Sequence, residues 1–151
     1  MLIHEGVYNR IIKSCADWQM EVGGILGGEN NIITEFEFDE GTALTSKQHY
    51  YPNIEKLNIY LESWQEDNIQ FYGIAHSHFQ DERGLSPGDI DYIHAIMSAM
   101  PSYIDFLYFP IILPQREMVS FKAVRAKNGV NIVNDDIKIL KKGGKSDETG
   151  N

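Results

Sequence analysis

With 151 residues, of which 42% are hydrophobic and 11% aromatic, the chain can bury a substantial core and has the composition of an ordered globular protein. Its formal net charge of −9 argues against nucleic acid and anionic membranes as partners, because such partners select a basic surface. No apolar run approaches the roughly 20 residues that span a bilayer, and the N-terminus lacks a signal-peptide pattern, so we expect a cytoplasmic protein. Cys15 is the only cysteine, which leaves histidine and carboxylate as the available metal ligands.

The first 40 residues predict a helix followed by a hairpin of two strands. An apolar residue at every fourth position predicts a helix over 5–17. Residues 21–28, EVGGILGG, predict a strand whose glycines mark a close backbone approach or a bend. Residues 31–40 alternate between apolar and polar side chains, as a half-exposed strand does, and Asn30-Asn31 is typical of the hairpin turn between the two strands.

The middle of the chain predicts helix, strand and helix. A helix over 53–67 is followed by a buried-type strand at 69–75 that runs into His76. The third helix is predicted to begin with Ser86 as its N-cap and Pro87 at its first position. Three further strands are predicted at 103–113, 118–126 and 129–140, with Pro110 marking a bulge or a sheet edge in the first of them.

This order of elements predicts the α/β class, with one mixed sheet flanked by helices. Residues 1–140 are predicted to form a single domain, since no linker or repeat interrupts them. Residues 141–151 contain no apolar side chain and predict a disordered tail.

His76 and His78 carry the first chemical signal. Residues at i and i+2 of a strand point to the same face, and their Cβ atoms stand about 6–7 Å apart. Two imidazoles at that spacing can converge on one ion, and Asp89, in the first turn of the helix that begins at Ser86, can add a carboxylate. Two histidines, one carboxylate and an open position are typical of a catalytic zinc site, whereas structural zinc sites are usually closed by four protein ligands.

Each part of this pattern also has a structural interpretation. A lone H-x-H pair is a weak signal, and Ser86 followed by Asp89 is what a capped helix start looks like. The whole spacing, H-x-H-x7-S-x2-D, is different, because by composition it would arise by chance in about one chain in two thousand of this kind. It also falls at the strand-to-helix junction that a metal site would need.

The stretch HSHFQDERGLSPGD, together with the upstream MEVGGILGG, resembles the signature of the JAMM metallopeptidases, also called the JAB or MPN-plus domain. The resemblance covers about residues 1–125, because the predicted elements also follow in the family's order. It implies a JAB/MPN-like fold with a layered architecture similar to that of cytidine deaminases.

The resemblance also implies a role for each residue of the motif. His76, His78 and Asp89 would hold zinc. Glu21 would be the general base, and Ser86 would stabilise the oxyanion that forms on the scissile carbonyl. Without the resemblance, Glu21 would be interpreted as a solvent-facing residue before a strand.

The loop between the second histidine and Ser86 departs from the family in one position. Phe79 stands where many members have proline, which leaves the ligand set intact and changes the mouth of the loop. Phe79, Asp81 and Glu82 are candidates for contact with substrate. A second aromatic loop, His49-Tyr50-Tyr51, is interpreted either as a binding segment or as a cover over the sheet.

The resemblance implies a zinc isopeptidase or peptidase that cleaves an amide at the C-terminal tail of a ubiquitin-like or sulfur-carrier protein. The chain has little room for inserted segments, so we expect a compact form of the prokaryotic type. The alternatives are a non-catalytic scaffold of the same fold, which would have no need of the filled motif, and a hydrolase with another substrate.

Overall fold

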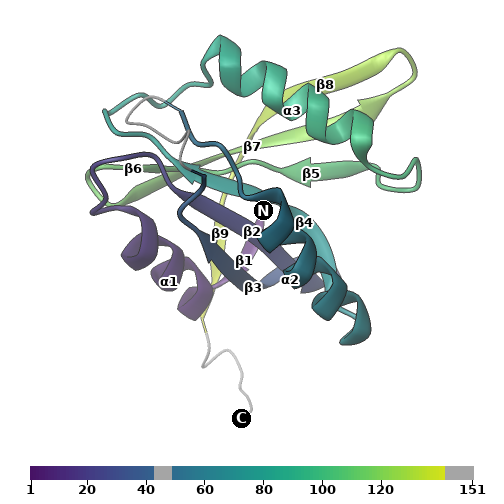
Figure 1. Cartoon of the computed structure of the whole chain (residues 1–151), viewed down its shortest axis with the longest axis horizontal. Coiled ribbons are helices and arrows are strands. Elements are labelled where there is room, and N and C mark those ends of the chain that lie inside the picture. Colours follow the sequence, from purple (N-terminus) through teal and green to yellow (C-terminus); the bar gives the residue numbers. More distant parts are fainter. Residues whose placement is uncertain (43–48, 142–151) are drawn as a thin grey trace.

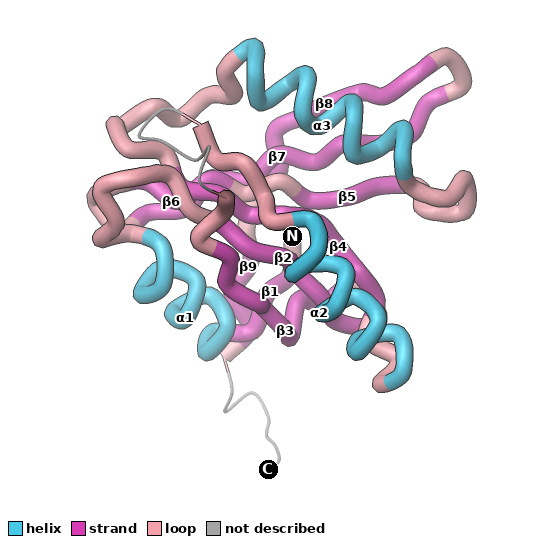
Figure 2. Tube along the Cα trace, in the orientation of Figure 1, coloured by secondary structure: helices cyan, strands magenta, loops and turns pink. Residues whose placement is uncertain are grey.

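The computed structural model describes residues 1–42 and 49–141, in which nine strands form a mixed sheet with three helices packed against it (Figure 1; Figure 2). In chain order the elements are β1 (Leu2–His4), α1 (Glu5–Cys15), β2 (Gly23–Glu29), β3 (Ile32–Asp39), α2 (Ile54–Glu66), β4 (Gln70–Ser77), α3 (Pro87–Ala99), β5 (Phe106–Tyr108), β6 (Ile111–Leu113), β7 (Glu117–Ala126), β8 (Gly129–Asp135) and β9 (Lys138–Leu140). The described strands follow the order β5-β7-β6-β4-β2-β3-β1-β9, with β8 paired to β7. The predicted class, a mixed sheet flanked by helices, is confirmed.

The sheet has an apolar core on each face. Helix α1 covers one face, and α2 and α3 lie over the other (Figure 1). Neighbouring strand residues point to opposite faces, and Leu26 and Ile25 of β2 accordingly pack into different cores. Val7 and Ile11 of α1 share the core of Leu26, whereas Ile25 packs with apolar residues of the other two helices, namely Leu57, Trp64, Ile93 and Met97. The site described below lies at one end of β4, a strand buried between these two layers.

The predicted hairpin between β2 and β3 is confirmed. Asn30 and Asn31 have φ angles of 53° and 63°, as the two central residues of a type I′ turn require. Asparagine tolerates this left-handed conformation better than most residues do. The predicted close backbone approach at the glycines is also present, because a Cβ at Gly23 or Gly24 would lie 2.2 Å from a carbonyl oxygen of a neighbouring strand. The register of β2 also shifts at Gly27 against both neighbouring strands.

The prediction of one strand over 103–113 is wrong, because β5 and β6 divide this stretch. Phe109 and Pro110 separate them, and a proline has no N–H to offer to a neighbouring strand. Both short strands pair with β4 on one side and with β7 on the other. Pro110 therefore marks an interruption inside the sheet, not an edge, and its carbonyl accepts the backbone N–H of His76 at 3.1 Å.

The prediction of one strand over 129–140 is also wrong. β8 pairs antiparallel with β7, and the chain then crosses to the other end of the sheet, where β9 pairs parallel with β1. β1 itself was not predicted, because three residues are too short to show an alternating pattern.

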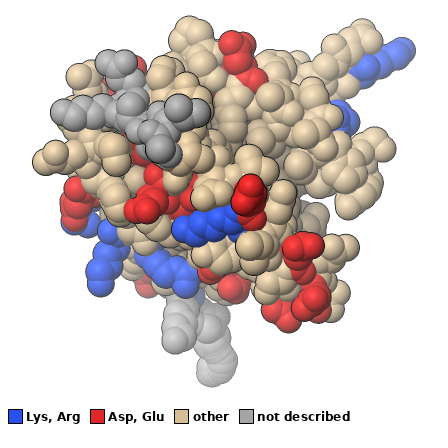
Figure 3. Space-filling view, viewed as in Figure 1, with Lys and Arg blue, Asp and Glu red and all other residues tan. Residues whose placement is uncertain are grey.

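The face of the molecule that Figure 3 shows is mixed in charge. Figure 3 shows acidic side chains in several places on one face, with basic side chains scattered among them. None of the described helices is both long enough and apolar enough to cross a membrane. The disordered tail was predicted for 141–151, and residues 142–151 of it lie outside the part of the chain that the structure describes.

Candidate metal centre

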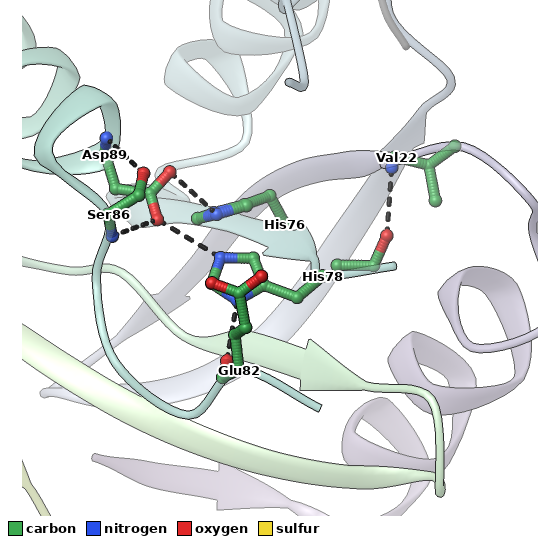
Figure 4. Close-up of polar contacts among 7 residues, drawn as sticks. Val22, His76, His78, Glu82, Ser86 and Asp89 are labelled. Carbon is green, nitrogen blue, oxygen red and sulfur yellow. Dashed lines mark hydrogen bonds and ion pairs between the residues drawn. The ribbon is translucent and has the colours of Figure 1, made fainter. Parts of the chain in front are cut away.

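His76 and His78 lie at the end of β4, inside the sheet. His76 pairs with Gly23 of β2 on one side and with Ile111 of β6 on the other. His78 is one residue beyond the strand, and its backbone N–H still donates to the carbonyl of Ile112 at 2.9 Å. Residues two apart on an extended backbone point to the same side, so the two imidazoles project together, with ring centroids 5.0 Å apart (Figure 4).

The start of α3 brings Asp89 to the same place. Ser86 is the N-cap, as predicted, and its Oγ accepts the backbone N–H of Asp89 at 3.0 Å. In return, Asp89 Oδ2 accepts the backbone N–H of Ser86 at 3.0 Å, which completes a capping box. The Asp89 carboxylate lies against both imidazoles, with Oδ1 3.3 Å from His76 Nε2 and Oδ2 3.1 Å from His78 Nε2 (Figure 4).

These three side chains fit a metal ion. Their ligand atoms all lie within 4.8 Å of one another. His76 Nε2 is buried, and among the described residues no partner meets the geometry of a hydrogen bond to it, since Asp89 is close but not aligned. His78 Nδ1 lies 2.7 Å from the carbonyl oxygen of Glu82, so Nδ1 carries a proton, and in the neutral ring Nε2 keeps the lone pair that a metal needs. Two imidazoles and one carboxylate form a donor set that can hold a divalent metal ion.

The electrostatics of the cluster favour a charged carboxylate. Burial alone would raise the pKa of Asp89, but the two adjacent imidazoles and the backbone N–H of Ser86 outweigh it and lower the pKa. Burial alone would lower the pKa of His78, whereas hydrogen bonding to Asp89 and to the carbonyl of Glu82 raises it overall.

Glu21 lies beside this cluster, just before β2. It is 7% exposed and lines a cleft of about 360 Å³ together with His78 and Ser86. Burial raises its pKa from 4.5 to about 7, although His78 opposes the rise. The neighbouring residue Val22 is held to β4, because its N–H donates to Ser77 Oγ at 3.0 Å and its carbonyl accepts the N–H of Ser77 at 2.8 Å (Figure 4).

The raised pKa of Glu21 predicts that the free energy of unfolding of the metal-free protein falls as the pH rises. A carboxyl whose pKa is higher in the folded than in the unfolded state stabilises the fold below pH 4.5 and loses that contribution as the pH rises through 7. Glu21→Gln should therefore unfold with a free energy about 1–3 kcal/mol above that of the parent at pH 8, and with little gain at pH 5. Denaturant unfolding of both proteins with chelator present measures this, and a gain independent of pH would contradict it.

Two of the three candidates for substrate contact line the cleft of Glu21, and the third does not. Phe79 and Glu82 line the same cleft as Glu21, and the Phe79 side chain is 39% exposed. Asp81 is not among the residues that line it, and its Oδ1 instead accepts a hydrogen bond from Gln115 Nε2 at 2.9 Å.

Two residues near the cluster were not singled out as site residues from the sequence. His49 lines the cleft of Glu21 and also a second cleft of about 210 Å³, which includes His76 and Asp89. The Tyr50 ring lies parallel to that of His76, with centroids 6.5 Å apart. A side chain at Gly23 would meet the Tyr50 ring at 2.8 Å, so glycine gives this tyrosine its space. The aromatic residues at 49–51 indicated a binding segment or a cover over the sheet, but the sequence did not indicate that the loop folds beside His76.

Solved structures show the same fold. A solution structure from Desulfitobacterium hafniense matches with a TM-score of 0.67 at 15% identity, over 94% of this chain and 95% of that one. A JAB1/MPN domain protein from Archaeoglobus fulgidus matches with a TM-score of 0.51 at 12% identity, over 93% and 96%. A structure described as "JAMM: a metalloprotease-like zinc site in the proteasome and signalosome" matches with a TM-score of 0.51 at 13% identity, over 93% and 97%.

At these identities the likeness establishes the fold, so the chain has a JAB/MPN fold with a candidate metal centre of His76, His78 and Asp89. A scan against family models and a search of curated proteins gave no match.

Proposed function

We propose that the chain is a zinc-dependent peptidase that hydrolyses an amide bond at the C-terminal tail of a ubiquitin-like or sulfur-carrier protein. The observation that carries the proposal is the convergence of His76, His78 and Asp89, with ligand atoms within 4.8 Å, beside a cleft lined by the buried Glu21. The description of one structural neighbour as a metalloprotease-like zinc site supports zinc as the metal. When bound, zinc would polarise the scissile carbonyl and lower the pKa of a water ligand.

Glu21 is the proton carrier in this proposal. Its pKa of about 7 lets the carboxyl gain and lose a proton near neutral pH, which is what a general acid-base residue needs. The ionised carboxylate accepts a proton from the attacking water and then donates it to the leaving amine. The pairing of Val22 with Ser77 keeps Glu21 beside the end of β4, so the proton carrier and the metal ligands share one rigid support.

Ser86 is proposed to stabilise the oxygen that becomes negative on the scissile carbonyl. Its Oγ accepts the backbone N–H of Asp89, which leaves the hydroxyl hydrogen free to be donated. The residue also lines the cleft of Glu21. Capping the helix and binding an oxyanion are therefore compatible uses of one hydroxyl.

The test is cleavage of purified fusions in which a ubiquitin-like or sulfur-carrier protein is followed by a short reporter peptide. We expect intact-mass analysis to show cut products at the C-terminus of the carrier, loss of the products with a chelator, and recovery with added zinc. A fusion with a scrambled tail is the matched control, and it should stay intact.

The outcomes separate the candidate functions. A protein that binds zinc at the three residues and cuts only unrelated peptides would be a hydrolase of another substrate class. A protein that neither binds zinc nor cuts any fusion would support the alternative of a non-catalytic interaction module of the same fold.

A further inference from the structure

His78 depends on its Nδ1 hydrogen bond for the orientation of its ring. The residue lies beyond the last residue of β4, so strand pairing fixes its backbone more than its side chain. The ring is held by the carbonyl of Glu82, 2.7 Å from Nδ1, on the side opposite to Asp89. Together with Asp89 at Nε2, this backbone carbonyl therefore sets where His78 Nε2 points, and it favours the proton on Nδ1.

Burial does not hold that carbonyl in place. The residues from Phe79 to Gly84 are all exposed and belong to no helix or strand. Within the loop itself, the Glu82 N–H donates to the Gln80 carbonyl at 2.7 Å, which shapes a local turn but does not attach it to the sheet.

The residues on either side of Glu82 tie the loop to the turn between β6 and β7. The Arg83 guanidinium forms two hydrogen bonds with the Glu117 carboxylate, at 2.6 and 2.8 Å. Asp81 Oδ1 accepts a hydrogen bond from Gln115 Nε2 at 2.9 Å. Glu117 is the first residue of β7 and pairs with Leu113 of β6, which belongs to the same sheet as the two histidines.

We propose that Arg83 and Glu117 act as a clamp that positions the metal ligand His78 through the Glu82 carbonyl. This inference rests on the proposed metal centre and assigns Arg83 as a positioning residue. A planar guanidinium that binds a carboxylate through two bonds fixes direction as well as distance, which suits an exposed loop. An exposed pair adds little to the stability of the whole fold, so its contribution should be seen at the metal site.

The test compares zinc affinity among variants by competition with a chromogenic chelator. Because loss of a hydrogen-bond partner of a ligand weakens metal binding by about 10–100-fold, and the clamp acts one residue further away, Arg83→Ala should weaken zinc binding by about 3–10-fold. Exchanging the two residues, Arg83→Glu with Glu117→Arg, should restore affinity. Arg116→Ala is the matched control, because Arg116 lies in the turn just before Glu117 and is as exposed as Arg83 but pairs with Asp17, and it should bind zinc normally.

A second readout needs no metal. The ¹⁵N signals of the His78 ring in the metal-free protein, recorded at a pH high enough for the ring to be neutral, report which nitrogen carries the proton, and Arg83→Ala should shift them toward a mixture of tautomers. If Arg83→Ala does not fold, Glu117→Gln tests the same contact with a milder change. If the parent protein failed to bind zinc, the proposed function would be wrong. The ring signals would still test whether Arg83 and Glu117 position His78. Unchanged affinity and ring signals in Arg83→Ala, an equal loss in Arg116→Ala, or no recovery in the exchanged pair would each overturn the clamp.

Discussion

Glu21→Gln is expected to bind zinc with the stoichiometry of the parent and to lose about 10²–10⁴-fold in turnover. The amide keeps the shape of the side chain but cannot accept and return a proton. Zinc binding should survive, because the three ligand atoms that converge belong to other residues. Steady-state kinetics on a cleavable fusion, with zinc measured in the same samples, gives both quantities.

Glu29→Gln is the matched control for this experiment. Glu29 lies at the other end of β2 and is exposed, so its substitution should leave both turnover and zinc unchanged. Loss of zinc together with turnover in Glu21→Gln would show that Glu21 belongs to the ligand set. Parent-like turnover in that variant would remove Glu21 from the reaction altogether.

Asp89→Asn and His76→Ala should each lower zinc affinity by more than about 100-fold while the protein stays folded. Loss of a hydrogen-bond partner of a metal ligand already lowers metal affinity by about 10–100-fold, so loss of a ligand itself should lower it further. The apolar cores on both faces of the sheet are large enough to keep the fold without a metal. Asparagine also retains an oxygen that can accept the Ser86 N–H, so the helix cap survives the change.

Asp91→Asn and His94→Ala are the controls for these two variants. Both residues lie on α3 and are exposed, and neither belongs to the cluster. Circular dichroism and thermal melts follow the fold, and chelator competition follows the metal. Unfolding of Asp89→Asn or His76→Ala without zinc would indicate a structural ion, and unchanged affinity would indicate that the ion is held elsewhere.

Local patterns were sufficient to predict much of the fold. The four-residue spacing of apolar side chains predicted α1, and Ser86-Pro87 marked the start of α3 correctly. The two asparagines between β2 and β3 gave the hairpin, because few residues adopt positive φ as readily. These features depend on residues close together in the chain, so the sequence carries them directly.

Contacts between distant segments could not be predicted in this way. The parallel pairing of β9 with β1 joins the two ends of the described chain, and no local pattern encodes it. The division of 103–113 into β5 and β6 depends on how Pro110 meets the neighbouring strands.

The candidate site also combines features that a local pattern predicts with features that it does not. The spacing from His76 to Asp89 indicated that the three side chains could converge, and the structure brings them together. Glu21 lies far upstream and was selected only by the resemblance to a family. The Glu82 carbonyl on His78 has no signature at all, because a backbone oxygen is common to every residue type.

Diffraction from crystals grown with zinc, measured on both sides of the zinc absorption edge, tests the metal centre most directly. We expect one strong anomalous peak bounded by His76 Nε2, His78 Nε2 and an oxygen of Asp89, at zinc–nitrogen distances of about 2.0–2.1 Å. An empty centre in crystals that hold zinc at other surface sites, or imidazoles turned away from each other, would contradict the assignment.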